Sequence, residues 1–210
     1  MLLRFPFTGR WVAQNSPADR VPSHGTTLFG SAYAIDFVMV DERGRSAPRT
    51  ARSVFATEPP ERFIGFGAPI LAPIDGTVVD THDGEPDHEA RRSPFTLIPY
   101  AFTQARRVSA GVAGTAGNHV VIAASPTGPY VLLAHLRRGS VRVRAGVVVR
   151  AGDQVGECGN SGNSTEPHVH VQASDSADWA AARAVPIGFT PAPDGDPAGW
   201  LPRNREPFVV

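Results

Sequence analysis

The sequence lacks lysine altogether, because each of its 20 basic residues is an arginine. Biotin, lipoate and a pyridoxal Schiff base each need a lysine amine, so these three cofactors are excluded. The one cysteine, Cys158, cannot form an intrachain disulfide. No apolar run approaches the roughly 18 residues that span a bilayer, and the first residues do not have the pattern of a secretory signal. As written, the sequence therefore predicts no membrane span and shows no export signal, which would leave the protein in the cytoplasm, but the localisation itself stays unknown from these features.

An excess of charge of either sign is also missing. Twenty acidic residues balance the 20 arginines, which gives a formal net charge of zero and an isoelectric point near 7.1. This balance predicts neither a nucleic-acid partner nor a polybasic membrane patch. The chain has 210 residues, of which 41% are hydrophobic, and this is enough for one domain with a sizeable core. The sequence gives no indication of oligomeric state.

Proline and glycine are frequent, with 20 and 21 residues, and they separate short apolar runs. This rhythm is typical of short strands and turns, so we predict a mainly β fold with a compact antiparallel sandwich or sheet core. The strands expected in one sheet are residues 33–40, 119–124, 130–136 and 168–173. Residues 175–184 have an acidic start and several alanines, which predicts one short helix near the C-terminus. We expect a single domain over residues 1–210 with its core at about 20–175, and loop insertions near 41–68 and 81–107.

The segment GNSTEPHVHV, residues 162–171, places two histidines two positions apart. On a strand, His168 and His170 would leave the same face with their Cβ atoms about 7 Å apart, so both can serve one site. Imidazole is the commonest metal ligand, and a catalytic zinc usually has three protein ligands and an open position for water. A lone H-x-H also fits exposed or packed histidines, so its significance depends on the residues around it.

Three further residues have suitable chemistry. SHGT contains His24, AIDF contains Asp36 between apolar residues, and LLAHL contains His135 near the end of an apolar strand. Each has an ordinary explanation by itself, as a solvated loop histidine, a strand-edge carboxylate or a histidine bonded to a backbone carbonyl. A carboxylate inside an apolar strand is costly to bury unless it is paired or binds a metal. Together with the H-x-H pair, these residues favour one metal-dependent site.

The order and flanks of these motifs resemble the lysostaphin-type or LytM-type zinc metalloendopeptidases, which cut peptide cross-bridges in bacterial cell walls. The similarity runs from about Ile70 to Gln172 through APIDGTVV, GNHVVI, YVLLAHL and VRAGDQVGECGNSGNSTEPHVHVQ, with SHGT and YAIDF upstream. It implies a compact antiparallel β core with a groove that contains one zinc ion per chain.

The resemblance also implies roles for individual residues. The zinc ligands of the family correspond to His24, Asp36 and His170, and its catalytic histidines correspond to His135 and His168. In most of the family three residues separate the first ligand from the aspartate, whereas eleven separate His24 from Asp36. A looped chain can still bring the two together, because ligands need proximity in space and not in sequence.

The function that the resemblance implies is zinc-dependent hydrolysis of peptide bonds, in peptidoglycan cross-bridges or stem peptides, by a metal-activated water. No H-E-x-x-H motif supplies a glutamate base, so His135 or His168 would take the proton of the water. The other histidine would stabilise the oxyanion or protonate the leaving amine. The alternatives are a non-catalytic LytM-type domain that binds or regulates a cell-wall partner, and a small-molecule metallohydrolase. The resemblance implies the cell envelope or the extracellular space, in tension with the missing signal sequence.

Overall fold

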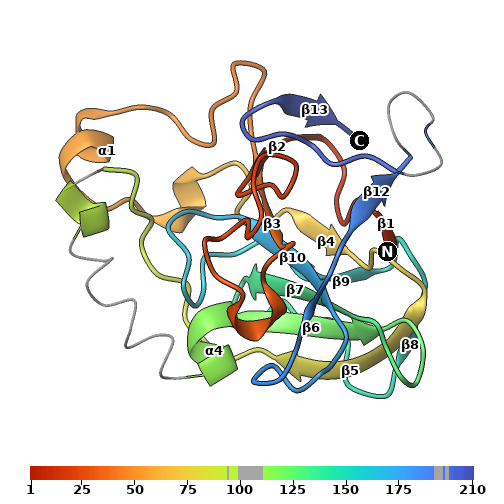
Figure 1. The fold of residues 1–210 in the computed structure, drawn as a ribbon. Coiled ribbons are helices and arrows are strands. Elements are labelled where there is room, and N and C mark those ends of the chain that lie inside the picture. The colour runs from red at the N-terminus through yellow and green to blue at the C-terminus, as the bar shows by residue number, and fades with distance from the viewer. Residues whose placement is uncertain (94, 99–110, 192–195, 197–198) are drawn as a thin grey trace.

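The computed structural model describes residues 1–93, 95–98, 111–191, 196 and 199–210, and in these residues the fold is mainly β (Figure 1). The strands are β1 (Leu2–Arg4), β2 (Arg10–Gln14), β3 (Ile35–Met39), β4 (Pro69–Leu71), β5 (Gly76–His82), β6 (Asn118–Ala123), β7 (Tyr130–Leu136), β8 (Val148–Val149), β9 (Gln154–Glu157), β10 (Val169–Ser174), β11 (Ala184–Val185), β12 (Gly188–Thr190) and β13 (Pro207–Val209). The helical segments are the 3-10 turns η1 (Leu28–Gly30) and η2 (Pro60–Arg62) and the helices α1 (Ala51–Phe55) and α4 (Gly111–Ala116). The predicted fold class is confirmed.

The main sheet contains nine strands within the described residues, in the order β13-β2-β3-β10-β7-β6-β5-β8, with β11 paired to the end of β10. Its strand pairs are antiparallel, as is the separate pair of β4 and β9. The exception is β1, which pairs in parallel with β12 and so joins the two ends of the chain. The four predicted strands correspond to β3, β6, β7 and β10, and they lie together in the main sheet, as expected.

The two faces of this sheet have different surroundings. Along β10, Val169, Val171 and Ala173 lie in the largest hydrophobic cluster, whereas His170 and Gln172 line a pocket on the other face. This alternation follows from the two-residue period of a strand. One face of the sheet therefore anchors the fold, and the opposite face is free to carry polar side chains.

The hydrophobic core uses both ends of the chain. Phe5 stacks on Phe189 with ring centroids 4.7 Å apart, and Phe7 stacks on Trp11 at 4.1 Å. All four aromatic side chains are buried in the same cluster as the apolar face of the main sheet. The packed core thus includes residues on both sides of 20–175, the range expected from the sequence.

The segment 41–68, expected as a loop insertion, is held by a buried ion pair. The Glu58 carboxylate is fully buried, and Arg92 donates to its two oxygens at 2.8 and 2.9 Å. The same guanidinium lies 4.9 Å from the centre of the Phe63 ring. These contacts join the first expected insertion, 41–68, to the second, 81–107, which contains Arg92. Part of the second insertion lies outside the described residues.

The short helix predicted for residues 175–184 is wrong, because the segment forms bends and turns. Its aspartates satisfy backbone groups locally: the Asp178 carboxylate accepts from the N–H two residues ahead at 3.1 Å, and the Asp175 carboxylate accepts from the N–H eight residues ahead at 2.8 Å. Such bonds compete with the helical ladder. Trp179 instead packs in a small cluster with Leu132, over the polar face of the sheet.

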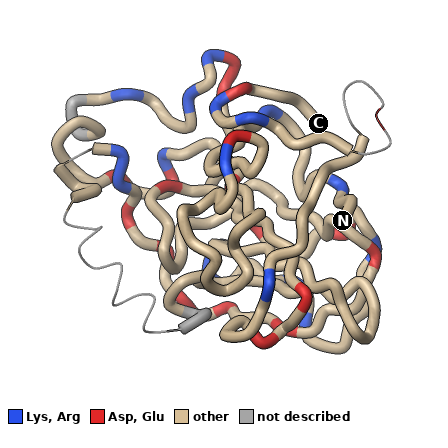
Figure 2. Tube along the Cα trace, viewed as in Figure 1, with Lys and Arg blue, Asp and Glu red and all other residues tan. Residues whose placement is uncertain are grey.

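Charged residues of both signs lie mostly on the outer loops, as Figure 2 shows. None of the helices in the described part of the chain is long and apolar enough to cross a membrane.

Candidate metal centre

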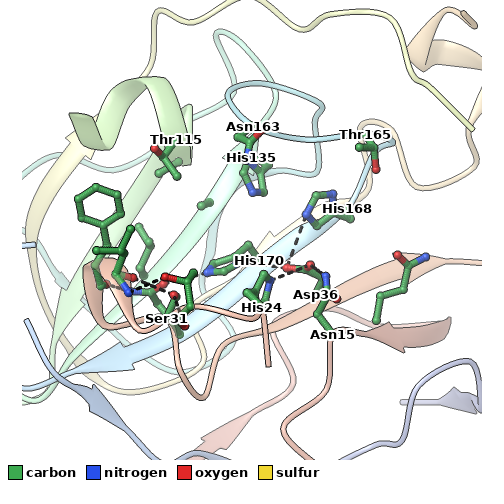
Figure 3. Close-up of a pocket in the computed structure, with 18 of the residues that line it drawn as sticks. Asn15, His24, Ser31, Asp36, Thr115, His135, Asn163, Thr165, His168 and His170 are labelled. Carbon is green, nitrogen blue, oxygen red and sulfur yellow. Dashed lines mark hydrogen bonds and ion pairs between the residues drawn. The ribbon is translucent and has the colours of Figure 1, made fainter. Parts of the chain in front are cut away.

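Three neighbouring strands bring the predicted site residues together. β10 lies between β3 and β7, and its register places His170 beside Asp36 on one edge and beside Ala134 on the other. The five residues predicted from the sequence line one pocket of about 350 Å³ (Figure 3). They are His24, Asp36, His135, His168 and His170.

His135 reaches the pocket through a break in the alternation of β7. Leu133 and Leu136 both lie in the hydrophobic core, although a regular strand would place them on opposite faces. The pairing with β6 shows the extra residue, because Val120 pairs with Leu133 and Asn118 with Leu136. His135 has a φ of 63°, in the left-handed region that side chains other than glycine rarely adopt. A bulge of this kind re-aims a side chain, and here it turns the imidazole into the pocket.

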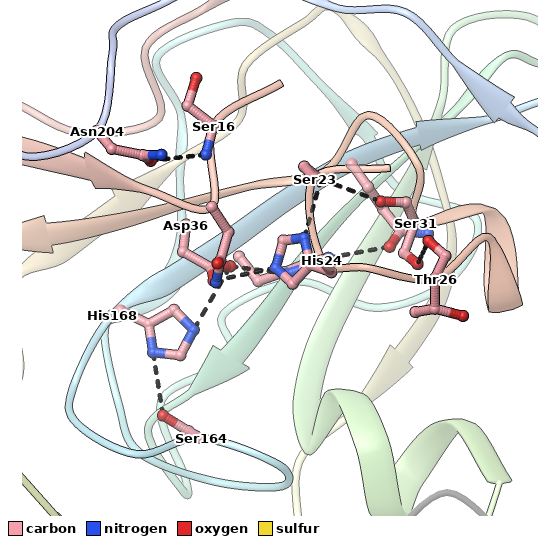
Figure 4. Close-up of polar contacts among 12 residues, drawn as sticks. Ser16, Ser23, His24, Thr26, Ser31, Asp36, Ser164, His168 and Asn204 are labelled. Atoms are coloured by element: carbon pink, nitrogen blue, oxygen red, sulfur yellow. Dashed lines mark hydrogen bonds and ion pairs between the residues drawn. The ribbon is translucent and has the colours of Figure 1, made fainter. Parts of the chain in front are cut away.

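His24 comes from the loop between β2 and β3. The backbone N–H of Ser23 donates to the carbonyl of Ala32 at 2.9 Å, which closes the loop on itself. As a result His24 Nε2 lies 3.0 Å from Asp36 Oδ2, despite the eleven residues between them (Figure 4). The long spacing noted in the sequence therefore does not keep the two apart.

The Asp36 carboxylate is the point at which these groups meet. Its Oδ1 lies 2.9 Å from His170 Nδ1 and 3.6 Å from His168 Nε2, and its Oδ2 accepts from the Asn15 amide at 2.8 Å. Burial alone would raise the pKa of Asp36. The charges of His24 and His168 and the hydrogen bonds from His170 and His24 outweigh it, and they hold the pKa well below its ordinary value. Asp36 is therefore ionised at neutral pH.

One group of side chains in the described residues could hold a metal ion, and it consists of His24, Asp36 and His170. One ligand atom from each lies within 4.8 Å of the others. Two imidazole nitrogens and a carboxylate oxygen form the kind of three-ligand set that leaves a catalytic zinc an open position.

Hydrogen bonds behind His170 determine which of its nitrogens carries the proton. Gln172 donates its amide N–H to the carbonyl of Phe29 at 2.8 Å, which turns its Oε1 toward His170 Nε2 at 2.9 Å. An amide oxygen only accepts, so Nε2 of a neutral ring carries the hydrogen and the lone pair of Nδ1 points at Asp36.

The partner of His24 on its outer side has the same effect. Ser23 Oγ donates to the carbonyl of Ser31 at 3.3 Å and so can accept from His24 Nδ1 at 3.0 Å, which leaves the lone pair of Nε2 toward Asp36. Two lone pairs and a carboxylate then face each other, an arrangement that needs a proton or a cation between them. Burial lowers the pKa of His24, but the charge of Asp36 and its hydrogen bond raise the pKa overall. The donor set therefore fits a divalent cation such as zinc.

His135 and His168 each donate a hydrogen bond from Nδ1 to a backbone carbonyl. His135 Nδ1 lies 2.9 Å from the carbonyl of Ser161, and His168 Nδ1 lies 2.8 Å from that of Glu166. Carbonyls only accept, so both Nδ1 atoms carry hydrogen and both Nε2 atoms keep a lone pair. Burial, with the charges of His168 and His170, lowers the pKa of His135 well below its ordinary value. The ring centroids of His135 and His168 are 4.6 Å apart, so the two imidazoles line the same small part of the pocket.

The residues that orient these groups were not predicted from the sequence. Gln172 had a visible signal, because it lies two positions after His170 and thus on the same strand face. Asn15 and Ser23 had none. Asn15 follows β2 with a φ of 49°, and its contact with Asp36 depends on the pairing of β2 with β3.

Comparison with known proteins gives one family match. Residues 100–181 match the model of Peptidase family M23, and this segment contains His135, His168 and His170 but not His24 or Asp36. The match confirms the resemblance that the sequence motifs indicated.

Solved structures of similar proteins include the catalytic domain of a mutant of the prophage-encoded M23 protein EnpA from Enterococcus faecalis. It is 20% identical, with 73% of each chain covered and a TM-score of 0.41. The catalytic domain of lysostaphin from Staphylococcus simulans is 18% identical, with 76% of this chain and 80% of that chain covered and a TM-score of 0.41. A putative glycyl-glycine endopeptidase lytM from Ruminococcus gnavus is 19% identical, with 72% of this chain and 42% of that chain covered and a TM-score of 0.38.

Proposed function

From the match of residues 100–181 to Peptidase family M23, we propose that this protein is a zinc-dependent endopeptidase that hydrolyses peptide bonds in peptidoglycan cross-bridges or stem peptides. The observation that carries the proposal is the convergence of His24, Asp36 and His170 on one point, with two more imidazoles beside it. We further propose that residues 1–210 form a single metallopeptidase domain, since both ends of the chain pack into one core.

His24 Nε2, a carboxylate oxygen of Asp36 and His170 Nδ1 would hold one Zn²⁺ per chain. When bound, the ion supplies positive charge that lowers the pKa of a water molecule to about 7 and polarises the peptide carbonyl. The hydrogen bonds that His24 and His170 donate to Ser23 Oγ and Gln172 Oε1 hold the two imidazoles in the tautomers that metal binding requires.

His135 and His168 would move the protons of the reaction. Nε2 of one ring accepts the proton of the attacking water, because the Nδ1–H of each ring is already committed to a backbone carbonyl. Nε2 of the other ring, once protonated, donates to the oxyanion or to the leaving amine. Both rings are buried against the sheet, so they need little rearrangement during the reaction.

The first test is the zinc content of the purified protein by elemental analysis. We expect one zinc per chain in the wild type, none in His24→Ala or His170→Ala, and one in the control His82→Ala, whose half-exposed side chain does not line the pocket. Hydrolysis of short peptides and of purified peptidoglycan is the second test. His135→Ala and His168→Ala should keep zinc and lose hydrolysis.

The alternative is a non-catalytic domain that binds or regulates a cell-wall partner. A wild-type protein that binds one zinc per chain, binds peptidoglycan and releases no new amino groups from it would favour this alternative. A protein without zinc after preparation in zinc-containing buffer would exclude the proposed enzyme.

A further inference from the structure

The two ends of the pocket differ in chemistry. Figure 3 places Ser31 and Thr115 on one side of the histidines, and the close chain neighbours of these two residues, Phe29 and Ala116, belong to one apolar cluster there. The apolar side chains that line the pocket are Leu28, Phe29, Ala116, Leu132, Ala134 and Trp179. Leu28 is 57% exposed, so a leucine on the pocket rim has no packing partner for most of its surface. Exposed apolar side chains beside a concave site are typical of ligand contacts.

Figure 3 places Asn15 and Thr165 on the other side of the histidines, and Glu166, the residue after Thr165, brings a carboxylate to the pocket there. Glu166 lines the pocket, its Oε1 accepts from the Gln14 amide at 3.3 Å, and its Oε2 accepts from the Ser46 hydroxyl at 2.7 Å. These two donors hold the carboxylate in place from two separate segments, the end of β2 and the loop that follows β3.

The charge of Glu166 is not balanced by the protein. Both of its donors are neutral, and the ion pairs among the described residues do not include it. The described lining of the pocket contains no arginine, and its histidines are arranged around Asp36. A partly buried carboxylate in such a pocket favours a cation from the ligand.

The backbone of Glu166 also lies beside one of the proposed catalytic imidazoles, and its side chain lines the same pocket. Its backbone carbonyl accepts from Nδ1 of His168, one of the proposed catalytic imidazoles, at 2.8 Å. A residue in an extended peptide advances only about 3.4 Å. A substrate ammonium at Glu166 therefore belongs to a residue near the bond that is cut, and the apolar wall faces the other side of that bond.

We infer that the pocket selects peptides with an ammonium group on one side of the scissile bond and an apolar side chain on the other, with Glu166 as the specificity determinant for the ammonium. This assignment of sides rests on the proposed function, but the two contacts themselves are properties of the pocket and can be measured without catalysis.

The test measures peptide binding to the zinc-free protein by calorimetry, so that no peptide is cut. The probes are capped tetrapeptides, leucine-glycine-glycine-lysine and its reverse, and the tighter binder is taken forward. Acetylation of its lysine should weaken binding about tenfold, because it removes a charge-assisted hydrogen bond. Replacement of its leucine by glycine should weaken binding about fivefold, through the loss of buried apolar surface.

Two variants assign these losses to the two ends. Glu166→Gln keeps acceptor oxygen and volume, and it should bind the lysine and acetyl-lysine peptides equally. Leu28→Ser changes an exposed side chain, and it should bind the leucine and glycine peptides equally. Glu42→Gln, at an exposed turn outside the pocket, is the matched control and should behave like the wild type. Unchanged circular dichroism and Tm would show that each variant is folded.

The inference is overturned if the wild type binds neither peptide order, if acetylation has no effect, or if Glu166→Gln keeps the full preference for lysine. The same peptides are then given to the zinc-loaded protein. Binding that follows the expected pattern without cleavage would contradict the proposed endopeptidase and leave the pocket assignment intact. Cleavage without any preference for the ammonium would support the proposed endopeptidase and contradict the assignment of Glu166.

Discussion

The two imidazoles that face Asp36 are held in different ways. His170 belongs to β10, which is hydrogen-bonded along both edges, to β3 and to β7. His24 belongs to a loop whose shape depends on a few bonds, such as the one from the Ser23 N–H to the Ala32 carbonyl. The sheet thus sets the position of one ligand through strand register, and the loop sets the other through local polar contacts.

Exposure follows the same division. The side chains of Asp36 and His170 are 10% and 11% exposed, whereas that of His24 is 21% exposed. Loop segments with few buried contacts open at a lower free energy than central strands. We therefore expect the sheet side of the site to be formed in the absence of metal, and the loop side to be where metal binding and local motion are coupled.

The largest effect is expected where sheet and loop meet, at Asp36. Asp36→Ala removes the carboxylate that contacts both ligand histidines, so the variant should contain no zinc and should hydrolyse no peptide. Elemental analysis and a peptide hydrolysis assay measure both. Asp41→Ala is the control, because Asp41 follows β3 and binds the exposed Arg45. One zinc per chain in Asp36→Ala would show that the metal does not bind here.

A smaller effect is expected from the residues behind the two imidazoles. Gln172 contacts both regions, since it accepts from His170 and donates to the carbonyl of Phe29 in η1. Ser23 supports His24 alone. Partners of this kind contribute about 10- to 100-fold to metal affinity, so we expect about 100-fold weaker zinc binding in Gln172→Met and about tenfold in Ser23→Ala.

Competition with a chromophoric chelator measures both affinities. If Ser23→Ala were instead the weaker zinc binder, the support of His24 within the loop would matter more for zinc affinity than the contacts of Gln172 with His170 and Phe29. Equal affinities of both variants and the wild type would mean that neither hydrogen bond orients a ligand.

The same division explains what the sequence could predict. Asp36 and the pair His168 and His170 lie on or beside strands, where the face of a side chain follows from local alternation. The orientation of His135 could not be predicted in this way, because it depends on a bulge that appears only when β7 pairs with β6. The closure of the loop that carries His24 depends on bonds between residues with no periodic pattern.

Outside the site, the prediction from the sequence was wrong where local side-chain hydrogen bonds replaced the backbone hydrogen bonds of a helix. Residues 175–184 have good helix formers, but Asp175 and Asp178 bond nearby backbone N–H groups instead. The contribution of both chain ends to the core was not visible either, since the stacking of Phe5 on Phe189 joins residues that are far apart in sequence.

The smallest expected effect concerns the charge of His24, the ligand residue in the loop. In the zinc-free protein burial lowers the pKa of His24, but Asp36 raises it above its ordinary value overall, and the pKa of Asp36 is held well below its own. The contribution of the pair to stability is therefore lost as the pH rises through the raised pKa of His24, and as it falls through the lowered pKa of Asp36. At pH 6, His24→Ala should destabilise the zinc-free protein by about 1 kcal/mol, a decrease of about 2–4 °C in Tm, and at pH 9 by much less.

Thermal unfolding in the presence and absence of a chelator distinguishes this charge effect from metal binding. Zinc needs the neutral imidazole, so its stabilisation of the wild type grows as the pH rises and the proton on His24 is released. With zinc, the difference between wild type and His24→Ala should thus be larger at pH 9 than at pH 6, the reverse of the zinc-free trend. If the zinc-free difference were the same at both pH values, His24 would not be the protonated partner of Asp36. The loop would then hold its imidazole by packing, as the sheet does, and the contrast between the two ligands would disappear.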